Sequence, residues 1–235
     1  MSHSNGDKRL KQVFEHFNSE ATVFDAGVLK SVPHYQEMIS VITSILPFKR
    51  TEKVALLDIG TGTGNIAYNL KRSFPASKLL CLDLSPKMIE VAKEKLKGFK
   101  GVEYVVADAA SFTLKQKYDA IVSSLTLHHL ETDKEKHAFH RKVFKALNPG
   151  GYFINADILI AEDQHVQDVN LAKWKAFILK ASTPAFAKDR YKKYLAEDRP
   201  AVLFEELSSL REAGFKGVEV YWKYYNFAVY GGQKK

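Results

Sequence analysis

The sequence predicts an α/β fold with a doubly wound, mostly parallel sheet, and three observations predict it. Short, continuous apolar runs, typical of strands that are buried on both faces, recur along residues 50–160. Segments with helical periodicity separate these runs. The chain of 235 residues, 46% of them hydrophobic, has room for one sizeable core. Strands that alternate with helices in this way build a parallel sheet with helices on both faces.

Two helices are predicted before the alternation begins, over residues 8–18 and 34–46, within an N-terminal helical cap of residues 1–48. The second helix begins just after Pro33, where a first-turn proline is tolerated, and ends at Pro47. Its apolar residues share one face: Tyr35, Met38, Ile39, Ile42 and Ile45. This helix is therefore amphipathic.

Residues 50–160 form the predicted core, with five strands and three helices. The strands, in order, are KVALLDI, KLLCLDL, VEYVVAD, YDAIVSSL and YFINADIL. The helices are GNIAYNLKRSF, SPKMIEVAKEKLKG and DKEKHAFHRKVFKAL. Ser85 is the expected N-cap of the second helix, with Pro86 at its first position and Gly98 near its end. The third helix stops at NPGG.

The alternation ends after Ile160. Residues 161–200 are helical, rich in lysine and aromatic residues, and show no strand pattern, so they are predicted to form a helical lid inserted beside the sheet. Residues 201–235 contain the last helix, which stops at Gly214, and a tail typical of edge strands. This tail, VEVYWKYYNFAVYGG, is expected at an antiparallel edge of the sheet.

The first strand leads into a glycine-rich loop, in which Asp58 is followed by Gly60, Gly62 and Gly64. Ligands of doubly wound sheets bind at the carboxyl ends of the strands, and glycines let a ligand approach the backbone. The third glycine comes one residue too early for a dinucleotide fingerprint, and no Lys-Ser/Thr pair follows as in a phosphate-binding loop. A carboxylate before the glycines suits a cationic ligand better than a pyrophosphate.

Two more strands also end in aspartates. Asp83 ends the second strand, where a carboxylate can accept both ribose hydroxyls, and Asp108 with Ala109 follows the third, where they can bind the edge of an adenine. A ligand with an adenosine, a cationic tail and no phosphate accounts for all three aspartates. S-adenosyl-L-methionine is such a ligand, so the sequence predicts it as the cofactor.

The core resembles the class I S-adenosylmethionine-dependent methyltransferases, which have a Rossmann-like fold. The similar segments are LLDIGTGTGN, CLDLSPKMIEVAKEKL, VEYVVADAASF, YDAIVSSLTLHHL and LNPGGYFINAD. The resemblance implies that Gly60, Thr61 and Gly62 line the methionine and ribose of the cofactor and that Asp83 holds the ribose. It further implies that adenine lies between Leu84 and Met88, that Asp108 and Ala109 bind its edge, and that Ser124 lies near the sulfonium.

The flanks resemble the carboxy-S-adenosylmethionine synthases, which serve wobble-uridine modification in tRNA. The similar segments are FNSEATVFDAGVLKSVPHYQEMIS and LREAGFKGVEVYWKYYNFAV. The resemblance implies that Tyr35 reaches the methionyl part of the cofactor and that an arginine, Arg190 or Arg199, holds an extra carboxylate. A gapless count places Tyr191 at that arginine's position, and Ser124 replaces the synthases' asparagine. Methyl transfer to a small-molecule acceptor is therefore the first hypothesis, and synthase activity is the alternative.

Candidate catalytic residues follow the last two core strands. His128 and His129 follow the fourth strand and Asp157 ends the fifth, and each could remove a proton from an acceptor or position it. Two lid tyrosines, Tyr191 and Tyr194, could shape the acceptor site together with the lid arginines. Trp174 and Phe186 are expected in the core of the lid. His137 and His140 are interpreted as surface residues of one helix, so no metal site is predicted.

Charge and cysteine content bear on location and partners. One cysteine, Cys81, permits no internal disulfide, and no signal peptide or bilayer-spanning apolar run is visible, so a cytoplasmic enzyme without a membrane partner is predicted. The net charge is +8, but the densest lysine segment alternates with glutamates as on a solvated helix face. Nucleic acid is thus a weaker alternative partner. In that alternative, the chain is a cofactor-binding or RNA-associated module without its own chemistry. A homodimer also stays open.

Overall fold

The structure, a computed structural model, describes the backbone of residues 3–235 and the side chains from Lys8 onward. Its centre is a seven-stranded sheet in the order β3-β2-β1-β4-β5-β7-β6. The parallel strands are β1 (Ala55–Ile59), β2 (Lys78–Asp83), β3 (Val102–Val106), β4 (Tyr118–Ser124) and β5 (Leu147–Ile158). The antiparallel strands are β6 (Lys216–Tyr224) and β7 (Phe227–Gln233). The predicted sheet with an antiparallel C-terminal edge is confirmed.

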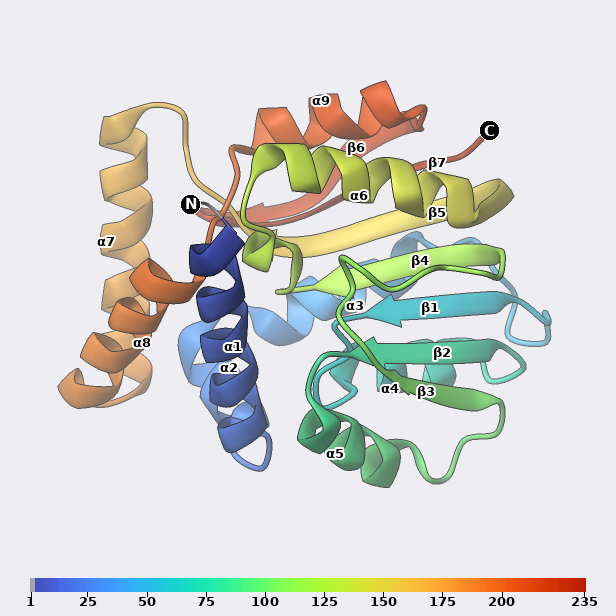
Figure 1. Cartoon of the computed structure of the whole chain (residues 1–235), viewed down its shortest axis with the longest axis horizontal. Helices are drawn as coiled ribbons and strands as arrows, with labels where there is room; N and C mark the ends of the chain where they lie inside the picture. The colour runs from blue at the N-terminus through green and yellow to red at the C-terminus, as the bar shows by residue number, and fades with distance from the viewer. Residues whose placement is uncertain (1–2) are drawn as a thin grey trace.

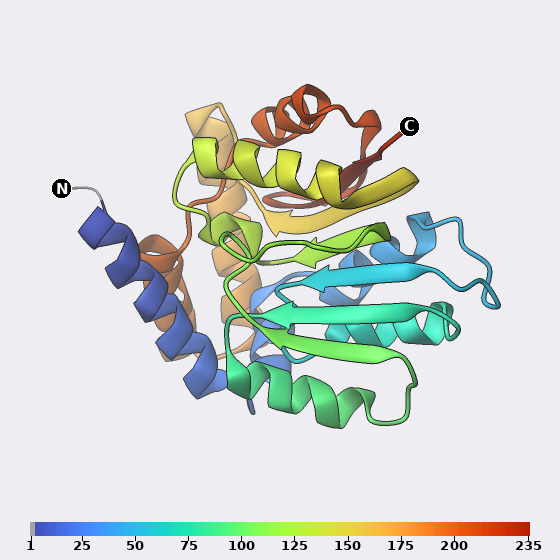
Figure 2. The same cartoon turned by 45° about the vertical axis from the view of Figure 1, so that its right-hand side comes forward.

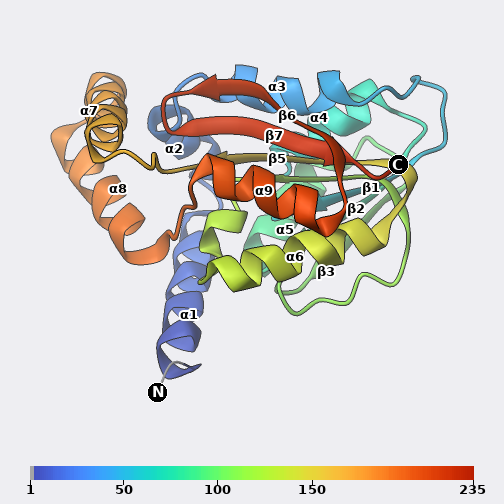
Figure 3. The same ribbon diagram turned by 90° about the horizontal axis from the view of Figure 1, so that it is seen from above.

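Helices cover both faces of the sheet, as Figure 3 shows from above. On one face lie α3 (Tyr35–Ile45), α4 (Asn65–Ser73) and α5 (Pro86–Leu96), and on the other lie α6 (Asp133–Ala146) and α9 (Leu203–Ala213). The amphipathic pattern of α3 has the expected consequence, because Met38, Ile39 and Ile42 are buried against the sheet. Two separate apolar layers result, one on each face.

Local sequence explains where several helices begin and end. The hydroxyl of Ser85 accepts a hydrogen bond from the Met88 amide at 3.2 Å, so Ser85 is the N-cap of α5 as predicted. A capping box between Thr132 and Glu135 begins α6. Gly214 ends α9 in the left-handed conformation with φ of 109°, which a glycine adopts without steric cost.

The remaining helices gather at the carboxyl ends of the parallel strands (Figure 1). They are α1 (His3–Glu20), α2 (Phe24–Ser31), α7 (Gln164–Ala181) and α8 (Pro184–Glu197), together with the short 3-10 helix η1 (Leu127–His129). Sequence analysis did not predict α2. Figure 2 shows α1 standing beside the strand ends rather than on a face of the sheet. Among residues 3–235, none of the helices combines the length and apolar character needed to cross a membrane.

Candidate active site

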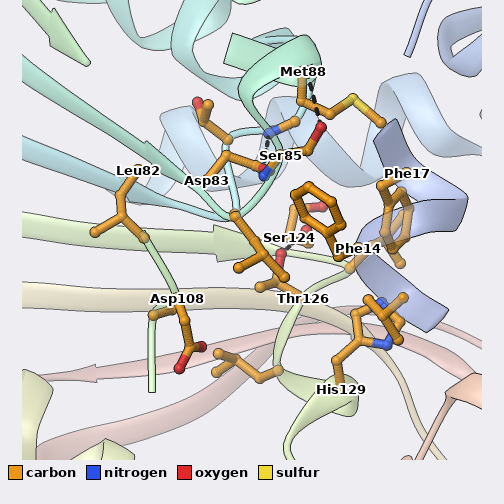
Figure 4. Close-up of a pocket in the computed structure, with 18 of the residues that line it drawn as sticks. Phe14, Phe17, Leu82, Asp83, Ser85, Met88, Asp108, Ser124, Thr126 and His129 are labelled. Atoms are coloured by element: carbon orange, nitrogen blue, oxygen red, sulfur yellow. Dashed lines mark hydrogen bonds between the residues drawn. The ribbon is translucent and has the colours of Figure 1, made fainter. Parts of the chain in front are cut away.

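A cavity of about 490 Å³ opens at the carboxyl ends of β1, β2 and β4. Figure 4 shows side chains that line it, with Asp83 and Asp108 at the strand ends, Met88 on α5, and Phe14 and Phe17 projecting from α1. The sequence patterns predict the side of the cavity formed by the strand ends, because parallel strands end at one edge of the sheet. They do not predict that α1 covers the cavity, because this segment was predicted only to be a helix. The sequence signal that could have indicated this position is a group of apolar residues in α1: Leu10, Val13, Phe14 and Phe17.

Most residues predicted to bind the cofactor line this one cavity. They are Tyr35, Asp58, Gly60, Thr61, Gly62, Asp83, Leu84, Met88, Asp108, Ala109 and Ser124. Gly64 does not line the cavity. It begins α4 with φ of 85°, and a Cβ atom there would lie 3.2 Å from the Cβ of Ala92 on α5. Gly64 therefore lets α4 and α5 approach each other.

The glycine loop is bound to the second strand by hydrogen bonds. The Gly60 amide donates to the Leu82 carbonyl at 2.8 Å, and the Gly62 amide donates to Oδ2 of Asp83 at 2.8 Å. Oδ1 of Asp83 accepts from the Ser85 amide, also at 2.8 Å. Each carboxylate oxygen keeps a second lone pair for a hydroxyl of a ligand. One carboxylate thus holds two loops together and can still bind a diol.

Asp58 is buried beneath the loop. Its Oδ2 accepts a hydrogen bond from the Thr61 hydroxyl at 2.6 Å. Burial raises the pKa of Asp58 to about 7, the Thr61 hydrogen bond opposes this shift, and the nearby carboxylate of Asp83 adds to it. A cationic group bound in the cavity would favour the ionised form of Asp58.

A polar network that the sequence did not reveal connects α2 and α3 to the loop. Oδ1 of Asp25 accepts from the Thr63 hydroxyl at 2.5 Å and from Nδ2 of Asn65 at 3.0 Å. Lys95 Nζ donates to Asp25 at 2.7 Å and to Asn65 at 2.6 Å. The Asn65 amide also donates to the Tyr35 hydroxyl at 3.3 Å. These contacts keep the buried ring of Tyr35 at the cavity wall.

Asp108 lies at the far end of the cavity (Figure 4). Its Oδ1 accepts from the Ala110 amide at 3.0 Å, and its Oδ2 accepts from the Ser111 amide at 3.2 Å. These bonds close the turn after β3 and set the direction of the carboxylate. As at Asp83, lone pairs remain for a ligand.

The two adjacent histidines have different surroundings. His129 lines the cavity, whereas His128 and Asp157 do not. His128 Nδ1 lies 2.5 Å from Oδ1 of Asp157, and its Nε2 lies 3.6 Å from Oδ1 of Asp198. Burial lowers the pKa of His128, but the two carboxylates outweigh it and the net pKa is raised. The two buried carboxylates on either side of His128 therefore favour its protonated form.

His129 is the neutral member of the pair. Burial and the neighbouring charge of His128 hold its pKa well below the usual value. Its Nδ1 lies 3.5 Å from the carbonyl oxygen of Glu197, which can only accept, so this contact places the proton on Nδ1. Its buried Nε2 has no hydrogen-bond partner in the described structure and is left as an acceptor.

His128, His129 and Asp198 each offer an atom within 4.8 Å of the others, a spacing that a metal ion could use. Positive charge on Arg190 acts on both histidines and Arg9 acts on His129, whereas the carboxylates of Asp157 and Asp198 act on His128 with the opposite sign, so these charges do not decide whether a cation binds. The expectation of no metal therefore stays a prediction on these residues.

The interpretation of His140 as a surface residue is wrong. Its side chain is fully buried between α6 and α9, and Nδ1 lies 2.7 Å from the Ser209 hydroxyl. Burial lowers the pKa of His140 to about 3. In α6, His140 lies on the same face as Phe139 and Val143. The sheet and α9 together cover a wider face of this helix than a narrow apolar stripe would indicate, so His140 is buried with them.

The residues expected to form an acceptor site in the segment 161–200 lie outside the main cavity. Tyr194 packs edge-on against Trp174 with ring centroids 5.1 Å apart, and Tyr191 stacks on Tyr194 at 6.0 Å. Arg199 donates to the carbonyl of Asp198 at 2.7 Å. Arg190 lines a smaller cavity of about 70 Å³ next to the main one, and its Nε has no partner in the described structure.

Comparison with known proteins agrees with this geometry. The family model for a methyltransferase domain matches residues 56–151. The chain is 29% identical over 230 residues to a carboxy-S-adenosyl-L-methionine synthase of Campylobacter hominis, covering 96% of both. An O-methyltransferase family protein from Burkholderia thailandensis has a similar structure, with TM-score 0.69 and 16% identity over 96% of this chain and 62% of that one.

A second solved structure is similar over the core. It is phosphoethanolamine N-methyltransferase 2 of Haemonchus contortus in complex with S-adenosyl-L-methionine, with TM-score 0.59 and 21% identity over 79% of this chain and 38% of that one. The match to the domain model and the aspartates at the strand ends support the predicted cofactor. Residues 56–151 are therefore a methyltransferase domain with a Rossmann-like class I fold, and the chain is an enzyme that uses S-adenosyl-L-methionine.

Proposed function

We propose that this enzyme transfers the methyl group of S-adenosyl-L-methionine to a small-molecule acceptor. The observation that carries the proposal is the carboxylate of Asp83, which lies at the cavity wall between the amides of Gly62 and Ser85 with lone pairs to spare. Its position suits the ribose hydroxyls. The adenine then lies between Leu84 and Met88, toward Asp108, and the methionyl tail extends toward Asp58 and Tyr35.

Methyl transfer needs alignment and, for an acceptor with a proton, a base. Ser124 ends β4, and Leu125 and Thr126 follow it; all three line the cavity between the strand ends and η1, where the sulfonium is expected. Of the three candidate bases, His129 is the one that lines the cavity, and its solvent-shielded Nε2 would reach an acceptor only after the ring rotates. His128 and Asp157 have positioning roles, since Asp157 also accepts from the His128 amide at 3.2 Å and so orients η1.

Cofactor affinity is expected to depend on pH through Asp58. Its pKa is raised to about 7, so below that pH the free enzyme carries a proton that the cationic tail must displace. Affinity for S-adenosyl-L-methionine should therefore rise about tenfold from pH 5.5 to pH 7 in calorimetric titrations.

Two controls isolate the carboxylate. The Asp58→Asn variant should bind more weakly and with little pH dependence. The ligand 5′-methylthioadenosine, which lacks the amino-acid tail, should bind the wild-type enzyme with little pH dependence. An unchanged pH dependence in Asp58→Asn would mean that another group is responsible.

A carboxy-S-adenosylmethionine synthase is the second candidate, favoured by similarity over 96% of the chain. Such an enzyme would need an arginine for the extra carboxylate. Of the arginines in the described structure, Arg9 alone lines the main cavity, and its donors bind Glu131, Glu197 and His129. Arg190 lies in the adjoining cavity, across Phe17 and Leu125. This arrangement favours methyl transfer.

Mass spectrometry of the ligand released from denatured, purified enzyme distinguishes the two candidates. Methyl transfer predicts S-adenosyl-L-methionine or S-adenosyl-L-homocysteine. A mass higher than that of S-adenosyl-L-methionine by one carboxylate, lost in an Arg190→Ala variant, would establish the synthase instead.

We propose a cytoplasmic location on the basis of the single, buried Cys81. A homodimer and an RNA partner are weaker possibilities that sedimentation and the salt dependence of RNA binding would test.

A further inference from the structure

The main cavity has a second, apolar end that the cofactor residues do not form. Its walls are side chains from α1, from α2 and from the segment after β4: Leu10, Val13, Phe14, Phe17, Phe24 and Leu130. His129 belongs to the same wall, because its ring lies edge-on to Phe17 with centroids 5.4 Å apart. We call this end of the cavity the α1 chamber.

Building on the proposed methyl transfer, we propose that the α1 chamber binds a largely apolar acceptor without a negative charge, such as a phenol or an amine, with its O–H or N–H group directed toward the cofactor. Aromatic and aliphatic side chains at this end provide apolar contact area, and aromatic rings pack well against such walls.

The charged residues at the rim of the chamber already have partners. Arg9 donates to the carbonyls of Glu197 and His129, each at 2.6 Å, and forms an ion pair with Glu131. Oε2 of Glu135 accepts from the Glu131 amide at 2.8 Å and from the Thr132 amide at 3.3 Å. An anionic acceptor would therefore lose its hydration without gaining a free counter-ion, which is costly.

The same contacts let Arg9 hold α1 over the cavity. Its side chain is 9% exposed and joins α1 to η1 and to the end of α8. The chamber is thus built from segments far apart in the chain, and its shape depends on α1 staying in place.

The chemistry balances with the cofactor and water. A lone pair of the acceptor oxygen or nitrogen forms the new bond to the methyl carbon, and the carbon–sulfur bond breaks with its electrons kept by sulfur. The acceptor proton passes to water in the cavity and then to bulk solvent. The products are the methylated acceptor and S-adenosyl-L-homocysteine.

The test uses the full chain saturated with S-adenosyl-L-homocysteine and two ring-matched probes, 4-methylphenol and 4-hydroxybenzoate. Ligand-observed NMR titrations measure the dissociation constant of each. We expect 4-methylphenol to bind at least about tenfold more tightly, because the carboxylate would be desolvated without a partner. Tighter binding of 4-hydroxybenzoate, or binding of neither probe at millimolar concentration, would overturn the proposal.

A pair of matched variants locates the bound probe. Val13→Thr keeps the side-chain shape but adds a hydroxyl at a position that is 4% exposed in the chamber wall, whereas Val23→Thr makes the same change at a position that is 61% exposed. Val13→Thr should weaken 4-methylphenol about tenfold and Val23→Thr should leave it unchanged. Equal affinities in both variants would place the probe elsewhere.

Binding of S-adenosyl-L-homocysteine, measured first in every variant, separates the two proposals. If the wild-type chain failed to bind it, the proposed function would fail. If it bound normally and the charged probe still won, only the acceptor assignment would fail.

Discussion

Replacement of Asp83 by alanine is expected to weaken S-adenosyl-L-methionine binding by about 100-fold or more, equivalent to about 3 kcal/mol. Two effects add. The ribose hydroxyls lose their acceptor, and the amides of Gly62 and Ser85, each 2.8 Å from the carboxylate, lose theirs as well. The loop and the start of α5 are then no longer held at the spacing that the ligand needs. Calorimetric titration of purified protein measures the loss.

Asp119 provides a matched control at the opposite end of the sheet. Its carboxylate also connects two segments, accepting from the Ala55 amide and from Nδ2 of Asn148, each at 2.8 Å. Asp119→Ala should therefore lower the free energy of unfolding without changing cofactor affinity. Equal affinities of Asp83→Ala and the wild-type enzyme would show that the cavity does not bind the adenosine as proposed.

The second large effect is expected for Gly60→Ala, which should destabilise the fold by about 3 kcal/mol and abolish cofactor binding. Gly60 has φ of 69°, and a Cβ atom there would lie 1.9 Å from Oγ1 and 2.7 Å from Cβ of Thr126. The turn after β1 and the segment after β4 would have to separate, and both line the cavity. Urea denaturation and cofactor titration measure the two losses.

Gly62→Ala is the control for backbone strain. Gly62 has φ of 54°, but no atom lies within 4 Å of its Cβ position in the described structure, so about 1 kcal/mol is expected. Combining Gly60→Ala with Thr126→Ala should recover part of the stability, because the hydroxyl and methyl of Thr126 are removed while its Cβ remains. A cost for Gly60→Ala no larger than for Gly62→Ala would contradict the role assigned to Thr126.

Much of the cofactor end could be predicted because its residues follow strands. The carboxyl ends of parallel strands meet at one edge, so Asp58, Asp83 and Asp108 lie around one cavity although 25 residues separate each from the next. Gly60 and Gly62 likewise follow from the turn that leads from β1. Gly64 shows the limit, since the same motif supplies both ligand-facing glycines and one that serves helix packing.

The acceptor end could not be predicted in this way. Its residues come from α1, whose position depends on Arg9 and on the ends of η1 and α8, and no local pattern encodes contacts between residues more than 100 positions apart. For the same reason, the sequence did not indicate that His129 lines the cavity whereas His128 does not. Whether residues 161–200 act as a lid stays a prediction, and the structure shows α7 and α8 packed on α1 and α2.

By itself, the sequence determined the order of the strands and helices of the core, the glycine turn and the carboxylates at the strand ends, because these depend on local propensity and on the geometry of a parallel sheet. The tertiary structure alone decided that α1 covers the cavity, that His129 lines it while His128 is held by Asp157, and that His140 is buried. Long-range packing and charge pairing set these features, and neither is visible in residue spacing.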